Sequence, residues 1–404
     1  EVGSRSFLGT GNNLSVAYEY YEDERPKSGY ELDFKDFNLR GTFMSLEGRY
    51  SNLWDREGYE VILSREFLTP ETKWAGGFEF GDLSQIRFEH ELVGGVPSEE
   101  DSIRIPYQRN FQDAWLGRAF LLKGADNRMN ISLASRVFRE DFTERPYVDA
   151  DSNQFFFNDL LFLNEVVLTK RKFLKSTLIQ AFGITEDIPI GYLFKLVGGY
   201  EFGEFEDRPY IGLGASAGDF WKGVGYFTAS AEFGGFMDDG KMEEGLVDIE
   251  ALYFSPLLRF HRNQFRQFVN IDYTTTVRPI VTQQFGFNDE IRGINRAVQG
   301  DRKLSVNFES VLFHPLKLYG FRMASFAFYD FGWISFGGPL ISSENFQSAI
   351  GIGLRLRNES LLFRTIQLRL GYLTASSEVD VSFSFSNPII FGNFRTSKPT
   401  IVEF

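Results

Sequence analysis

Glu309, Asp330 and Arg292 are the charged residues whose types and positions could support a shared role. Glu309 lies in a segment whose other face carries apolar side chains, which are Leu304, Val306, Phe308 and Leu312. Asp330 lies in the next segment, opposite an aromatic set of Tyr329, Phe331 and Trp333. Since side chains alternate along a strand, both carboxylates are expected on the same polar side of neighbouring strands. An arginine that folds back from the preceding stretch can bridge two such acids through charge-assisted hydrogen bonds.

Two glycines accompany this set of charges. Gly293 follows the arginine and would let the backbone pass close to a wall of strands. Gly332 shares the predicted inward face of Asp330. An alternative stays open at this point, because inward acids and a loop arginine are also ordinary features of any polar interior.

Other chemistry is poorly supported by the sequence. The three histidines, His90, His261 and His314, lie far apart without the spacing of metal ligands, and cysteine is absent. The run from Asp149 to Leu160 resembles the start of a calcium loop but lacks its glycine and its final glutamate. The net charge of −13 argues against nucleic-acid binding, which needs a basic face. We therefore expect no enzyme, no catalytic residue, no metal and no cofactor.

The elements that must position these residues are strands. Apolar and polar residues alternate over long segments, for example from Val379 to Ser386 and from Leu14 to Tyr20. Several segments reach the roughly 9–11 residues that a tilted membrane strand needs, and no apolar stretch of about 18 residues exists. Phenylalanine occurs 45 times, and aromatic residues make up 17% of the chain, which suits a lipid-facing surface. The sequence predicts an all-β fold, a single transmembrane antiparallel β-barrel over residues 1–404 with about sixteen strands.

Polar stretches interrupt the alternation at 94–112, 139–153 and 278–303 and predict long loops. The last of these contains Arg292 and is expected to insert into the lumen, the space that the sheet encloses. Residues 387–404 are interpreted either as the last strand or as a C-terminal tail that folds back.

Several motifs, in order along the chain, resemble those of the BamA/TamA superfamily of outer-membrane barrels. Ile291-Arg292-Gly293-Ile294 is similar to the family's Val-Arg-Gly-Phe/Tyr loop motif, although Ile294 replaces the usual aromatic residue. Phe328-Tyr329-Asp330-Phe331-Gly332 resembles its Phe-x-Asp-x-Gly strand motif, and Phe7-Leu8-Gly9-Thr10-Gly11 resembles the entry to its first strand. The segments 349–355 and 367–372 look like its closing strands.

The resemblance implies sixteen strands and a weak lateral seam, or gate, where the first and last strands meet. The seam would consist of the residues Leu14, Val16, Tyr18, Val379, Val381, Phe383 and Phe385. It also implies that Glu309 and Asp330 hold Arg292 in the lumen, with Gly293 and Gly332 beside them. Periplasmic POTRA domains usually precede such a barrel, and none is expected within residues 1–404.

The implied function is that of an outer-membrane insertase or translocase in a Gram-negative bacterium. Two alternatives remain, a secretion pore of the two-partner type and a membrane anchor for an upstream enzymatic, patatin-like domain. The implied partners are outer-membrane lipid (lipopolysaccharide or phospholipid), client outer-membrane or secreted proteins, and accessory lipoproteins.

Overall fold

The described part of the chain is almost entirely β-structure. The computed structural model describes residues 2–4, 11–22, 24–69, 71–93, 96–122, 129–179, 185–280, 284–287, 290–294, 297–358, 365–385 and 394–402. Its two helical elements are single 3₁₀ turns, η2 (Leu39–Gly41) and η3 (Gln154–Phe156). Among these residues no helix has the length and apolar character to cross a membrane.

The strands follow one another along the whole chain. Those of the first half are β1 (Val2–Ser4), β2 (Asn13–Tyr20), β3 (Ser28–Asp36), β4 (Ser45–Asn52), β5 (Arg56–Arg65), β6 (Trp74–Val93), β7 (Val96–Leu121), β8 (Met129–Glu144), β9 (Asp159–Thr177), β10 (Thr185–Gly203) and β11 (Asp207–Trp221). Those of the second half are β12 (Gly225–Asp238), β13 (Lys241–Phe254), β14 (Leu258–Phe260), β15 (Asn263–Val277), β16 (Gln284–Gly286), β17 (Ala297–Gln299), β18 (Arg302–Leu318), β19 (Phe321–Ser335), β20 (Phe346–Asn358), β21 (Ile366–Leu373) and β22 (Glu378–Phe385).

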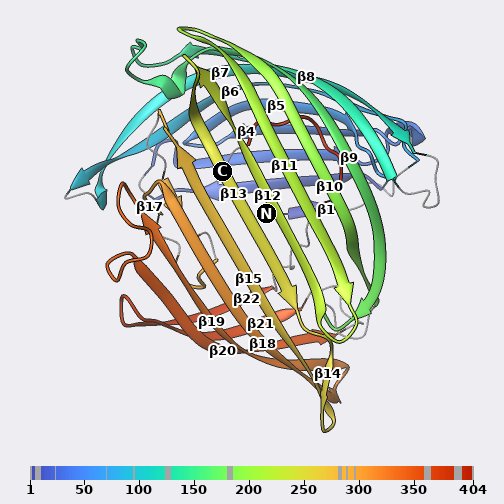
Figure 1. Ribbon diagram of the computed structural model, residues 1–404. Coiled ribbons are helices and arrows are strands. Elements are labelled where there is room, and N and C mark those ends of the chain that lie inside the picture. Colours follow the sequence, from blue (N-terminus) through green and yellow to red (C-terminus); the bar gives the residue numbers. More distant parts are fainter. Residues whose placement is uncertain are drawn as a thin grey trace.

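Twenty of these strands form one antiparallel sheet, in which neighbours in sequence are neighbours in space. The sheet curls around on itself into a barrel shape, with its first strands at the back of the view and its last strands below (Figure 1). Strands β16 and β17 form a separate hairpin. The predicted all-β antiparallel fold is confirmed. The sheet has more strands than the expected sixteen or so, even when the three-residue strands β1 and β14 are set aside.

The two faces of the sheet differ as the alternation predicted, and β11 is a clear case. Its side chains are alternately exposed and buried from Asp207 to Gly218. Ile211 and Leu213 lie on the outer face, 43% and 48% exposed, whereas Tyr210 is buried on the inner face. Because large apolar side chains on this outer face lack protein neighbours, the face suits contact with lipid.

The two ends of the sheet are β22 and β1. Among the described residues, β22 pairs with β21 alone, and β2 pairs with β3 on one side and with β1 on the other. The short strand β1 covers only the first part of β2, since Val2 pairs with Val16 and Ser4 with Leu14. The described sheet is therefore open between β22 and the β1–β2 edge.

The predicted loop at 94–112 is wrong, because these residues largely belong to strands. β6 and β7 form the longest hairpin, of 20 and 26 residues, and β7 contacts the small strand β17. A strand of 26 residues exceeds what a bilayer requires, so its outer part does not need an apolar face. This explains why its sequence is polar.

Candidate functional site

The long stretch between β15 and β18 packs against the inner face of the sheet. Its residues Phe285, Phe287 and Ile291 are at most 3% exposed. They belong to one apolar cluster with inner-face residues of β19, among them Phe326 and Phe328. Apolar burial thus holds this loop inside the sheet, on the side of β18–β20.

Arg292 lies within this loop, close to both acids. Its Nη1 is 2.9 Å from Glu309 Oε2 in an ion pair that lacks hydrogen-bond geometry, and its Nε is 3.2 Å from Asp330 Oδ2. The backbone N–H of Arg292 also donates to Asp330 Oδ2, at 3.3 Å. The guanidinium lies over the Phe328 ring, 4.4 Å from its centre. Since Glu309 and Asp330 are 8% and 0% exposed, the arginine neutralises carboxylates that would be costly to bury alone.

A second arginine, Arg355 of β20, completes the arrangement. It donates bidentate hydrogen bonds to Glu309, at 2.7 and 2.9 Å, and a third to Gln367 at 2.8 Å. Its guanidinium lies 4.4 Å from the centre of the Phe326 ring. Sequence reasoning missed this role, although Arg355 alternates with the apolar residues Leu354 and Leu356 and so belongs to the inner face. We call Arg292, Arg355, Glu309 and Asp330 the brace.

Two glycines make the close approach of the loop possible. Gly293 has a φ of +88°, and a Cβ there would lie 3.2 Å from Leu373 and 3.3 Å from Asp380. A Cβ at Gly332 would lie 2.7 Å from the Phe287 ring and 2.4 Å from the Leu304 carbonyl oxygen. Both positions therefore require the small residue that the sequence places there.

A lysine and an asparagine of β18 hold the loop just before Arg292. Lys303 Nζ is 2.5 Å from Glu290 Oε1 and 3.5 Å from Asp272. The Asn307 side chain donates a hydrogen bond to the carbonyl oxygen of Glu290. The loop is thus fixed at Glu290 and at Arg292, two residues apart.

The expected seam residues lie on β22, one end strand of the sheet, and on β2, the strand next to the other end strand β1. Tyr18 is 66% exposed, and Val379, Val381 and Phe383 are 65%, 76% and 64% exposed. Leu14 and Val16 pair with β1, whereas Tyr18 lies beyond that pairing. The backbone of Phe385 pairs with Ile366, and its side chain lies outside the described residues.

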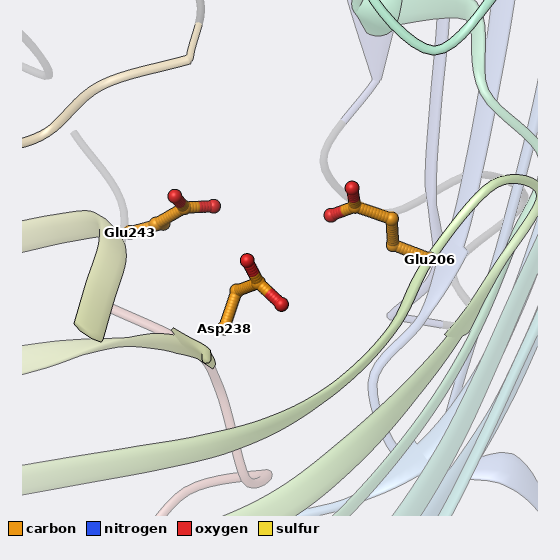
Figure 2. Close-up of side chains that lie close together, drawn as sticks. All are labelled: Glu206, Asp238 and Glu243. Carbon is orange, nitrogen blue, oxygen red and sulfur yellow. The ribbon is translucent and has the colours of Figure 1, made fainter. Parts of the chain in front are cut away.

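Three carboxylates gather where β10–β11 and β12–β13 turn (Figure 2). Ligand oxygens of Glu206, Asp238 and Glu243 lie within 4.8 Å of one another, and Glu206 is exposed. Carboxylates at this spacing can bind a divalent cation. We assign the cluster no role, because exposed acids commonly approach one another without an ion.

No family model and no curated protein matches this sequence. Solved structures that are similar to this chain at low sequence identity include the following two. The BamA structure from Haemophilus ducreyi, which lacks POTRA domains 1–3, is 10% identical with a TM-score of 0.47, and the match covers 92% of this chain and 68% of that one. CdiB from Acinetobacter baumannii is 15% identical with a TM-score of 0.44, covering 92% of this chain and 57% of that one.

Proposed function

We propose that this chain is the membrane-spanning barrel of an outer-membrane insertase or translocase of a Gram-negative bacterium. Its outer face would contact lipopolysaccharide or phospholipid, as the exposed apolar residues of β11 suggest. It would act by binding and by conformational change rather than by covalent catalysis. The motif resemblance in the sequence and the open sheet support this proposal.

The main support for this proposal is that both edges of the sheet lack a full partner strand among the described residues. β22 has no partner on one side among the described residues, and β2 is covered by β1 over three residues only. Unpaired backbone donors and acceptors are costly in lipid, where water cannot satisfy them. Such edges can instead bind an incoming polypeptide by strand addition. A client strand would therefore pair at the seam before it leaves into the bilayer.

The brace has a distinct part in this proposal. It ties the loop to β18, β19 and β20, close to the β22 end of the sheet but not across the opening. It would hold this side of the barrel in shape while the seam opens.

Engineered disulfides test the role of the seam. The chain has no cysteine, so an introduced pair would contain its only thiols. Tyr18→Cys would be combined in turn with Val379→Cys, Val381→Cys and Phe383→Cys, because all four side chains face outward. The assay is insertion of a urea-unfolded barrel protein into liposomes of phosphatidylethanolamine and phosphatidylglycerol. We expect oxidation of at least one pair to abolish insertion and reduction to restore it.

Tyr18→Cys with Tyr30→Cys is the matched control, because these residues are already partners in β2 and β3. Its oxidation should leave insertion unchanged. Full insertion by a barrel with a verified disulfide across the seam would refute lateral opening. A large, steady conductance of that locked barrel in a planar bilayer would favour the secretion pore instead.

A further inference from the structure

The last described residues of the chain, Phe394–Val402, lie against the inner face of the sheet. We call this segment the tail. It contacts inner-face side chains of β8, β9 and β11, including Ser132, Thr169 and Tyr210. These strands are far from the two ends of the sheet. The tail therefore occupies the lumen rather than the seam.

The tail runs along the wall and bends at Lys398. Its first residue lies beside Gly218, where a Cβ would be 3.1 Å from the Phe394 ring, and Val402 bonds to Tyr210. Phe394 and Val402 are eight positions apart in the chain, but Val402 lies beside Gly234, where a Cβ would be 3.0 Å from its side chain, and Gly234 pairs with Gly212 of β11. The eight steps of the tail therefore cover only about six residues of β11, from Gly218 to Gly212, on the order of 20 Å.

The wall binds the main chain of the tail at three positions, namely Phe394, Pro399 and Val402. The Thr169 hydroxyl donates to the Phe394 carbonyl oxygen at 3.1 Å, and Arg136 Nη1 donates to the Pro399 carbonyl oxygen at 3.0 Å. The Val402 N–H donates to the Tyr210 hydroxyl at 2.8 Å. Contacts to backbone atoms do not depend on side-chain identity, so the same groups can hold another extended segment.

The wall has an apolar pocket for the first side chain of the tail. Phe394 is 1% exposed and packs with Val167 and Leu193. The pocket exists because residue 218 is glycine, whose missing side chain leaves room for the ring. An aromatic residue is therefore the side chain that this position fits best.

Four residues later the wall has an acidic pocket. Lys398 Nζ is 2.8 Å from Asp113 Oδ2 and 3.4 Å from Glu79 Oε2. Asp113 is only 3% exposed and also pairs with Arg136 at 2.8 Å. The two residues between Phe394 and Lys398 that face away from the wall, Arg395 and Ser397, are exposed. The wall thus contacts alternate side chains of residues 394–398, as it would along a strand.

We propose that this inner wall is a binding site for an extended client polypeptide with an aromatic residue four positions before a basic one. The tail is an internal competitor that fills the site at rest. A client segment displaces it, because each contact of the tail can be reproduced by another extended chain of that pattern.

The inference deepens the proposed function, since it names a site that clients contact on the way through the lumen. It is tested separately, because binding to the wall does not require the seam to open. A barrel with an oxidised seam disulfide should still bind peptide. Failure of one proposal therefore leaves the other standing.

The experiment uses a labelled synthetic peptide of residues 386–404 and the barrel lacking these residues, in detergent micelles. Fluorescence anisotropy should show saturable binding to the shortened barrel. Binding to the intact chain should be at least about tenfold weaker, because its own tail competes at a high effective concentration. Equal binding to both proteins, or binding of a scrambled peptide as tight as that of the native one, would overturn the proposal.

Peptide variants test the two pockets. Phe394→Ala should weaken binding about a hundredfold, as expected for loss of a buried ring. Lys398→Glu should weaken it about tenfold, because a carboxylate would then face Asp113. Ser397→Glu is the matched control, since it places the same carboxylate one residue earlier on the exposed side. Equal effects of the two glutamates would contradict the acidic pocket.

The shortened barrel could fail to fold, since the tail contributes buried contacts. The intact chain with both Phe394→Ala and Lys398→Glu then replaces it, because these changes weaken the tail in place. It should bind the native peptide at least about tenfold more tightly than the unaltered chain does. An unchanged affinity would show that the tail does not occupy the peptide site.

Discussion

The two sides of the opening in the sheet are built differently. On the side of β18–β20, the brace and the loop bury charged and aromatic side chains against the sheet, among them Glu309, Asp330 and Phe328. On the side of β2–β5, no large apolar side chain of the described residues is buried. The inner face of these strands carries ion pairs that stay partly exposed, such as Arg49–Asp33 at 2.8 Å and Arg56–Glu31 at 2.7 Å.

Under the proposed opening of the seam, this difference predicts which side moves. Local opening is easiest where few buried contacts must be broken. Strands β2–β5 should therefore shift or separate while β18–β20 keep their shape. A seam of this kind would need only one flexible side, provided that the opposite side is held from within.

The largest expected effect is on the brace. Arg292→Ala leaves Glu309 and Asp330 with less compensation, and breaking a buried ion pair typically costs about 3–5 kcal/mol. The substitution should lower the unfolding midpoint in denaturant and impair barrel assembly. Lys241→Ala, at an exposed hairpin, is the control and should behave like the unaltered protein. Equal unfolding midpoints and equal assembly of the two variants would show that the brace does not stabilise this side of the barrel.

A smaller effect is expected at Gly293. Alanine there would be strained by the positive φ of +88° and would also contact Leu373 and Asp380. Gly240→Ala is the matched control, because Gly240 has a φ of +75° but nothing within 4 Å of a new Cβ. The backbone term alone is about 1 kcal/mol, so Gly293→Ala should destabilise by more than Gly240→Ala does. Chemical denaturation measures both, and equal losses would mean that the loop does not press on the wall.

On the opposite side of the opening the effects should be slight. Arg49→Ala removes a partly exposed ion pair with Asp33 and should cost less than about 1 kcal/mol. Hydrogen exchange should meanwhile be faster in β2–β5 than in β18–β20 of the unaltered protein. A loss as large as that of Arg292→Ala, or slower exchange in β2–β5, would reverse the comparison.

The smallest effect concerns a loop outside both regions. Hydrogen bonds from Arg145 lower the pKa of Glu204, which also accepts a hydrogen bond from the Asn158 N–H. The stabilisation is fully present above the ordinary glutamate pKa, about 4.3, and is lost as pH falls through the lowered value. Proteolysis of residues 145–158 should therefore increase only in strong acid. Glu204→Gln should show the increase already at neutral pH, and a pH-independent rate in both proteins would contradict this role.

The alternation of side chains made the fold and part of the site predictable. The inward directions of Glu309 and Asp330 follow from their apolar neighbours, and Arg292 lies between them in the structure. Arg355 was missed because its height relative to Glu309 depends on the stagger of β19 against β20. There Ala324 pairs with Arg355 and Phe328 with Gly351, and no sequence pattern specifies that register.

Two other features of the fold could not be predicted from the sequence. The polar sequence at 94–112 predicted a loop, although most of these residues belong to β7. Strands that extend beyond a bilayer need no apolar face. The sequence of residues 387–404 is compatible both with a last strand and with a folded-back tail. The residues that bind the tail, Thr169, Arg136 and Tyr210, are 225, 263 and 192 positions away from their partners in the sequence. Such pairings arise from tertiary structure alone.

The alternating exposure of residues 394–398 has a consequence for how the wall can discriminate between segments. A strand-like occupant presents alternate residues, so two recognised side chains must be separated by an even number of positions. Insertion of one residue between Phe394 and Lys398 would turn the lysine toward the lumen and leave Asp113 without it. Insertion of two would restore its direction at a shifted height. The wall would thus distinguish an odd from an even number of positions between the two recognised side chains. Such a parity rule is more permissive than a fixed motif, yet it excludes half of the possible spacings.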